Sequence, residues 1–238
     1  MGGRNRMVRK LRLLTTLAVE VAFKRRVLPD WHADHDDIEV VWAPTNVLME
    51  KIRGGERGDV VILIDKPMAE LAAGGIVAAD SIMPIAQAKF GLGVKAGADK
   101  PDISTPDAFV EALRSAGRIA YSLTGASGQY FLTLLDRLGI ADEILARAVS
   151  IPAGFTGEKL LDGEADMAVQ QVSELMSVQG VDVVGPFPDP LQQPTDFSAA
   201  MFAEAENPAL AREFLLHLTS RKAHEAYEAG GLASRITS

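Results

Sequence analysis

Short runs of aliphatic and β-branched residues alternate along the chain with longer segments whose apolar residues recur at helical spacing. The runs that predict strands are Leu11–Thr15, Ile38–Trp42, Val60–Ile64, Gly91–Lys95, Ile119–Ser122, Ala148–Ile151, Met167–Gln170, Val181–Val184 and Phe197–Phe202. The segments that predict helices are Leu17–Leu28, Val47–Arg53, Met68–Ala73, Pro106–Ala116, Ser127–Leu138, Gly157–Leu161, Ser173–Ser177, Pro208–Thr219 and Ala223–Ala229. This alternation is typical of an α/β protein with mostly parallel sheets and crossover helices.

Two proline-containing segments interrupt the pattern and predict linkers between two lobes. They are Met83–Lys89 and Gln192–Asp196. On this reading residues 1–86 and 197–238 together form lobe 1, which is discontinuous in sequence, and residues 87–196 form lobe 2. A ligand cleft is expected between the lobes, because ligands of α/β proteins bind where elements of two domains meet.

Composition narrows the classes of function. Hydrophobic residues make up 47% and charged residues 24% of the 238 residues, which is typical of a globular protein. The net charge of −8 argues against nucleic acid, whose phosphates are bound by clustered Lys and Arg. The chain has no cysteine, no apolar stretch of 18 residues and neither a Walker nor a dinucleotide-binding motif. We therefore expect no cofactor, no metal ion and no membrane span.

The N-terminal region has some features of a secretion signal. Residues 1–12 hold five basic side chains and no acid, and the apolar run Leu13–Ala22 follows. Glu20 interrupts that run, and Lys24–Arg26 follows it without a cleavage site of small residues. A strand that leads into a helix explains the pattern better, so the sequence as it stands predicts a cytoplasmic protein. A missing upstream signal would make it periplasmic.

Polar residues of small size stand at the junctions where predicted strands pass into helices. The segment Tyr121–Gly128 is one such junction, and its small residues allow backbone N–H groups to approach an anion at the start of a helix. The same residues are also compatible with an ordinary helix cap. Because ligands of open α/β sheets bind beyond the carboxyl ends of the strands, several such junctions are expected to converge. The candidate ligand-binding residues at the junctions are Thr15, Thr16, Thr45, Asn46, Ser122, Thr124, Ala126, Ser127, Gly128, Gln170 and Gln171.

Six segments carry a resemblance to a known family. They are Leu14–Val19, Ala43–Leu48, Arg57–Leu63, Tyr121–Phe131, Ala168–Leu175 and Ala211–Ser220. In order and spacing, over residues 10–233, they resemble bacterial extracellular solute-binding proteins of the molybdate-binding type. The resemblance implies a type II periplasmic-binding-protein fold, in which two α/β lobes joined by two crossover strands close on the ligand.

The resemblance also implies a set of site residues. Hydroxyl groups, backbone N–H groups and a tyrosine hold the oxyanion in that family. Those positions fall here on Thr16, on Thr45 or Asn46, on Ala126–Gly128, on Phe155 with Thr156, and on Gln171, which replaces the tyrosine. The change to glutamine and the Pro44-Thr45-Asn46 sequence favour a larger carboxylate over molybdate.

Two classes of function remain open. In the first, the chain binds a small oxyanion or organic carboxylate for an ABC permease, with Lys89 at the predicted crossover as a candidate cation. In the second, the same cleft isomerises a small polycarboxylate, as aconitate isomerase does in this broad fold family. That chemistry needs an acid and a base. The candidates are Lys89, Tyr121 and Glu174.

Overall fold

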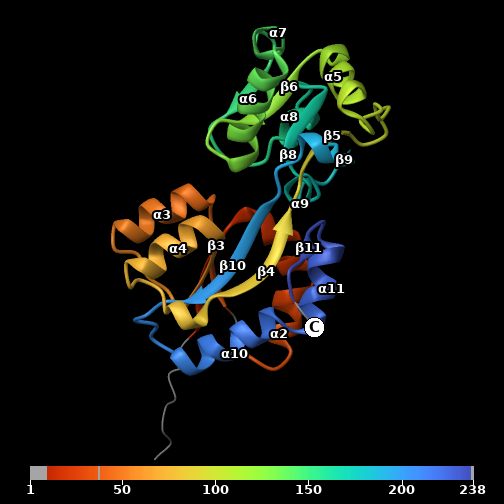
Figure 1. Cartoon of the computed structure of the whole chain (residues 1–238). Coiled ribbons are helices and arrows are strands. Elements are labelled where there is room, and N and C mark those ends of the chain that lie inside the picture. The colour runs from red at the N-terminus through yellow and green to blue at the C-terminus, as the bar shows by residue number, and fades with distance from the viewer. Residues whose placement is uncertain (1–9, 37, 237–238) are drawn as a thin grey trace, which may run out of the picture.

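The computed structural model describes residues 10–36 and 38–236, which form two mixed β-sheets flanked by helices. Residues 1–9 of the basic N-terminal segment lie outside the described part of the chain. Figure 1 shows the two sheets in separate lobes, one above the other, with the long strand β4 running up to the junction and β10 running down from it. The predicted α/β architecture with two lobes is confirmed.

The first lobe is built on a six-stranded sheet in the order β11-β4-β10-β3-β1-β2. Its strands are β1 (Arg12–Thr15), β2 (Glu39–Trp42), β3 (Val60–Ile64), β4 (Met83–Ala88), β10 (Thr195–Met201) and β11 (Ala233–Ser234). Its helices are η1 (Leu17–Val19), α1 (Glu20–Ala22), η2 (Phe23–Val27), α2 (Leu28–His32), α3 (Thr45–Arg53), α4 (Asp65–Ala73), η3 (Ala79–Ser81), α10 (Pro208–Leu218) and α11 (Arg221–Ala229). β1 is parallel to β2 and β3, whereas β10 is antiparallel to β3 and β4.

The second lobe contains a five-stranded sheet in the order β7-β6-β8-β5-β9. Its strands are β5 (Phe90–Lys95), β6 (Ile119–Ser122), β7 (Val149–Ile151), β8 (Met167–Gln171) and β9 (Val181–Pro186). Its helices are α5 (Pro106–Ser115), α6 (Ala126–Leu138), α7 (Ala141–Leu145), α8 (Glu158–Leu161), α9 (Val172–Leu175) and η4 (Asp189–Leu191). β6 is parallel to β7 and β8, and β5 is antiparallel to β8 and β9.

Apolar side chains on both faces explain why the central strands of the first lobe read as unbroken hydrophobic runs. Leu13 packs into the core beneath α10 and α11, while its neighbour Leu14 packs into the core beneath α3 and α4. Val60 and Val61 alternate in the same way on β3. A strand that is buried on both faces carries apolar side chains at every position and does not alternate with polar ones. This burial fixes the register that brings the carboxyl ends of β1, β2 and β3 together.

The first helical segment runs past Pro29 to His32, so the predicted end at Leu28 is wrong. A π-helical turn, η2, precedes the proline, and the N–H of Leu28 bonds to the carbonyl of Phe23. Pro29 then falls in the first turn of α2, directly after the π-helical turn.

The predicted linkers are largely strand, which is a second correction. Met83–Ala88 forms β4 and pairs with β10 and β11, despite Pro84 near its start. The chain passes between the sheets at Lys89 and again between β9 and β10. The Gln192 side chain ties these crossings together, because it accepts from the N–H of Phe90 at 3.0 Å and donates to its carbonyl at 2.9 Å. The lobe limits at 86/87 and 196/197 fall inside β4 and β10, and the division stays a prediction.

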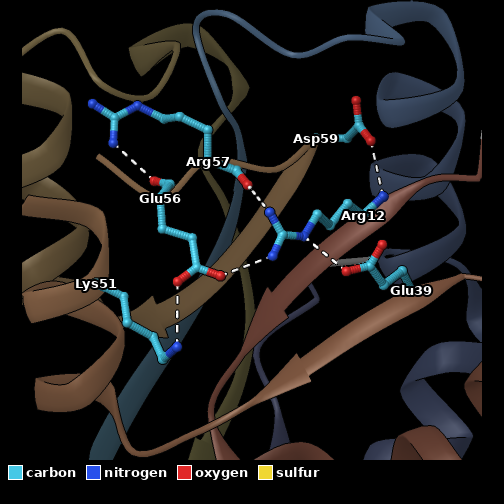
Figure 2. A network of polar contacts seen from close by, with 6 residues as sticks. All are labelled: Arg12, Glu39, Lys51, Glu56, Arg57 and Asp59. Carbon is cyan, nitrogen blue, oxygen red and sulfur yellow. Dashed lines mark hydrogen bonds and ion pairs between the residues drawn. The ribbon is translucent and has the colours of Figure 1, made fainter. Parts of the chain in front are cut away.

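A polar network fixes the start of β1, at the end of the sheet opposite to the strand-to-helix junctions (Figure 2). The guanidinium of Arg12 donates to Glu39 at 3.1 Å, to Glu56 at 2.8 Å and to the carbonyl of Arg57 at 2.9 Å. The buried Asp59 accepts from the N–H of Arg12 at 2.8 Å. These bonds join β1, β2 and the loop between α3 and β3, and so hold in place the strands that carry the junctions.

Candidate functional site

A cavity of about 390 Å³ lies between the two lobes. The first lobe lines it with Thr16, Leu17, Pro44, Thr45, Asn46, Met49, Glu50, Arg53, Ile64, Pro67, Glu70 and Phe197. The second lobe lines it with Ser122, Thr124, Gly125, Ala126, Ser127, Gly154, Gln170, Gln171 and Glu174. Its volume falls within the range of small-molecule sites. The structure therefore brings most of the predicted junctions to one place.

Two helices from opposite lobes begin at this cavity. Helix α3 starts at Thr45 after β2, and helix α6 starts at Ala126 after β6. Among the described residues, neither helix has a side-chain cap at its N-terminus. The first intrahelical bonds are donated by the N–H groups of Leu48 and Gln129, so the N–H groups before them have no helical acceptor. Free N–H groups and the positive ends of two helix dipoles thus border the cavity.

The loop before α6 is shaped by close backbone packing. The N–H of Gly125 donates to the hydroxyl of Ser122 at 3.0 Å, and the hydroxyl of Thr124 donates to the carbonyl of Pro152 at 2.8 Å. A Cβ on Gly128 would lie 1.6 Å from the carbonyl oxygen of Ser122. Only glycine therefore allows α6 to start this close to β6. The role of Gly128 is to seat the helix, and it does not line the cavity.

Gln170 holds the neighbouring loop of the second lobe. Its side-chain oxygen accepts from the N–H of Thr156 at 2.8 Å and from its hydroxyl at 2.9 Å, and its amide nitrogen donates to the carbonyl of Gly154 at 3.1 Å. Thr156 is fully buried behind this amide. The arrangement fixes Gly154 at the cavity.

Two cavity residues carry buried polar atoms that the protein leaves without a hydrogen bond. They are Oγ1 of Thr45, from the first lobe, and Oε1 of Gln171, from the second, in the described part of the chain. Rotation of the Gln171 amide by 180° places an N–H donor at the same point. A buried polar atom without a partner costs about 1–3 kcal/mol. A polar ligand in the cavity would remove that cost.

Glu174 supplies a half-buried carboxyl group at the junction of the lobes. It lies on α9, which packs against β8 in its own lobe and against η1 and α1 in the other. The N–H of Gln171 donates to its carboxylate at 3.3 Å. Burial raises the pKa of Glu174 to about 7, hydrogen bonds from Gln171 and Gln170 lower it in part, and the negative charge of Glu20 raises it further.

The cavity also carries charged side chains that the sequence reasoning missed. Glu50 and Arg53 lie on α3 and Glu70 lies on α4, and all three are exposed. The guanidinium of Arg53 stands 3.4 Å from the Glu70 carboxylate. Asn46, Glu50 and Arg53 are spaced at i, i+4 and i+7, which places them on one helix face. With Asn46 already a candidate site residue, this spacing could have predicted that Glu50 and Arg53 face the cavity.

Several predicted site residues do not line the cavity. Thr15 is buried in β1, and Phe155 and Thr156 belong to the loop that Gln170 holds but do not line the cavity. The ammonium group of Lys89 stands 3.9 Å from Asp189, in the other crossing between the lobes. Tyr121 packs beside Phe131 at a ring separation of 6.0 Å. Lys89 was predicted from its position at a crossover, but position in sequence does not fix the direction of a side chain.

Residues 10–36 and 38–236 contain no group of three His, Asp or Glu side chains placed to hold a metal ion. No helix in the same residues has the length and apolar character needed to cross a bilayer.

Two α/β lobes that enclose a polar cavity at their strand-to-helix junctions define a binding protein of the two-lobed type. The model of the bacterial extracellular solute-binding protein family matches residues 22–233, and the chain belongs to that family. The expected type II periplasmic-binding-protein fold is confirmed by solved structures that superpose on the chain.

The named relatives include one enzyme and two proteins that bind inorganic anions. Aconitate isomerase from Pseudomonas sp. is 39% identical over 183 residues, which cover 76% of this chain and 70% of that protein. The periplasmic molybdate-binding protein of Azotobacter vinelandii has a TM-score of 0.78 at 18% identity, over 94% of this chain and 99% of that one. The sulfate-binding protein SubI from Mycobacterium tuberculosis H37Rv has a TM-score of 0.73 at 15% identity, over 95% and 87%. The two structural matches show the fold alone.

Proposed function

We propose that the cavity binds a small anion that bears carboxylate groups, and that the two lobes close on it. The proposal rests above all on the pairing of α3 and α6, whose N-termini reach the same cavity from opposite lobes. Backbone N–H groups and helix dipoles attract an anion without a fixed counter-charge. The net charge of −8 does not prevent this, because the local field of the helix termini acts at short range.

The polar side chains of the cavity support a ligand with several oxygen atoms. Thr45 and Gln171 each hold a buried atom that no described residue satisfies, and they come from different lobes. Thr16 and Ser127 add two further buried hydroxyl-bearing side chains. One ligand that bonds to both lobes stabilises the closed arrangement, because it contributes binding free energy only when the lobes meet.

Size and charge favour a carboxylate of several carbon atoms. A cavity of about 390 Å³ is larger than a single tetrahedral oxyanion fills. Apolar side chains such as Leu17, Met49 and Phe197 stand beside the polar ones and suit a carbon skeleton. Arg53 offers a guanidinium that can bind a second carboxylate in a bidentate manner.

A transport role follows from the family. In that role the protein binds its ligand outside the cytoplasm and delivers it to an ABC permease in the membrane. The permease then recognises the surface that the closed lobes form. This support comes from the match to extracellular solute-binding proteins over residues 22–233.

A second function is favoured by one observation, the relative that is 39% identical and named aconitate isomerase. If this chain shares that activity, its ligand is an unsaturated tricarboxylate. Binding and catalysis use the same cavity, so the two functions predict the same ligand class. They differ in whether the ligand leaves unchanged.

A thermal-shift panel tests the proposed ligand class. Aconitate, other di- and tricarboxylates, molybdate and sulfate are each added to the purified chain, because a ligand of the folded state raises its melting temperature. We expect carboxylates to raise it more than the two inorganic anions. Thr45→Val should reduce the shift, whereas Thr133→Val on the exposed face of α6 should not. If no anion of the panel raises the melting temperature, the proposal is wrong.

A further inference from the structure

Glu174 differs from the other carboxylates of the cavity in its surroundings. Glu50 and Glu70 are exposed on α3 and α4, where water solvates their charges. Glu174 lies where α9 of one lobe packs against η1 of the other, and it lines the cavity beside Thr16 and Gln171. The packed helices shield the Glu174 carboxyl group from water on one side. On its other side the carboxyl group faces the cavity, where a ligand can reach it.

The charged groups around Glu174 provide no cation to hold it ionised. No ion pair of Glu174 exists among the described residues. Glu20 is the charged side chain of α1 that acts on it, and Glu20 is itself paired with Lys24. β8 contributes no titratable side chain. Lys95 and Asp182 stand at the far ends of β5 and β9.

A role as a helix cap does not account for this placement. In a capping box the N3 glutamate accepts from the N-cap N–H, as Glu174 does from Gln171 at 3.3 Å. An exposed glutamate serves that purpose equally well and needs no burial at a cavity. Burial raises the pKa of Glu174 to about 7, so the group exchanges a proton near neutral pH. Acid–base catalysts work best under that condition.

We infer that Glu174 is a catalytic residue that moves a proton between two carbon atoms of an unsaturated polycarboxylate bound in the cavity. This inference rests on the second function proposed above. The Glu174 carboxylate takes a proton from the methylene carbon next to one ligand carboxylate. The C–H electron pair forms a new double bond and the charge spreads over the allylic system and its carboxylates. The protonated Glu174 then returns the proton to the far carbon of the former double bond. The double bond has moved by one position, and nothing has been oxidised or reduced.

The remainder of the cavity suits the charge that this step creates. Negative charge develops on the ligand carboxylates in the intermediate, and the N-termini of α3 and α6 border the same cavity. Preformed N–H dipoles stabilise such charge without reorganisation. Arg53 on α3 supplies a further positive group. Glu174 is therefore the proton carrier, and the helix termini hold the substrate.

Proton NMR in deuterium oxide tests the inference. The purified wild-type chain is incubated with the cis or the trans isomer of aconitate, and both isomer conversion and deuterium uptake at carbon are followed. We expect both in the wild type, with a kcat/KM that rises as Glu174 ionises and levels off above about pH 7. Glu174→Gln should slow both by about 100-fold or more. Glu174→Asp should retain more activity than Glu174→Gln.

Calorimetric titration with aconitate separates this inference from the proposed ligand. Glu158→Gln removes an exposed first-turn glutamate from another short helix, α8, and should react as the wild type does. Glu174→Gln should still bind aconitate within a few-fold of the wild-type affinity. Binding by the wild type without conversion or deuterium uptake, or full activity in Glu174→Gln, would overturn the role of Glu174 alone. Absence of binding by the wild type would overturn the carboxylate proposal and this inference with it.

Discussion

Glu174 should make the stability of the folded chain fall as the pH rises. Its pKa is raised from an ordinary value of 4.5 to about 7 by burial, so the folded state binds the proton more tightly than the unfolded state. The stabilisation from that proton is fully present below pH 4.5 and is lost as the pH rises through about 7. The sign is opposite to that of a salt-bridged carboxylate.

The magnitude follows from the same rise in pKa. Each pH unit corresponds to about 1.4 kcal/mol of free energy, so a pKa raised from 4.5 to about 7 gives at most about 3.5 kcal/mol. The cavity leaves part of the carboxylate open to water, which lowers the expected value to about 2–3 kcal/mol. Glu174→Gln keeps the shape and the acceptor oxygen but cannot ionise.

Urea denaturation at several pH values between 5 and 8 measures this effect. We expect the free energy of unfolding of Glu174→Gln to gain about 2–3 kcal/mol over the wild type across that range. The control Glu158→Gln alters an exposed glutamate and should follow the wild-type pH dependence. If Glu174→Gln follows it too, the carboxyl group ionises freely in the folded chain and the argument from burial is wrong.

Four further substitutions separate the ligand site from the scaffold. Thr16→Ala and Gln171→Ala should each weaken binding of a carboxylate by about 1–3 kcal/mol in calorimetric titration, and unchanged affinity in both would remove these residues from the site. Gly128→Ala adds a Cβ that meets a carbonyl oxygen at 1.6 Å, so the free energy of unfolding should drop by about 1–3 kcal/mol or more; an unaltered urea midpoint would show that α6 tolerates displacement. Asp59→Ala leaves two N–H groups without their carboxylate acceptor and should destabilise the chain by about 1–3 kcal/mol per group while the affinity for ligand stays the same. A loss of affinity in Asp59→Ala would show that the network of Figure 2 is coupled to the cavity.

The strands that the sequence predicts best are those buried on both faces. Val60–Ile64 is an unbroken apolar run because its side chains fill two cores, and the strand is observed with those limits. β4 was missed because Pro84 and Gln87 break its apolar pattern. Both are compatible with a strand that pairs irregularly, since the register of β4 and β10 shifts at Phe197 and Ser198.

The candidate site was predictable where it depends on chain topology. Thr16 follows β1, Thr45 follows β2 and Gln171 ends β8, so the carboxyl ends of the strands bring them to the cavity. Arg53 lies about two helical turns after the end of β2, and Glu70 lies more than one turn after the end of β3. Whether their side chains reach the cavity depends on how α3 and α4 pack. That packing is set by contacts distant in sequence, which local patterns do not contain.

A crystal structure with aconitate shows whether an anion binds between the N-termini of α3 and α6. We predict ligand oxygen atoms at about 3 Å from first-turn N–H groups of both helices, with Thr45 and Gln171 as further partners. A ligand that contacts one lobe only, or that occupies a different place on the chain, would show that the two helix N-termini do not form the anion site.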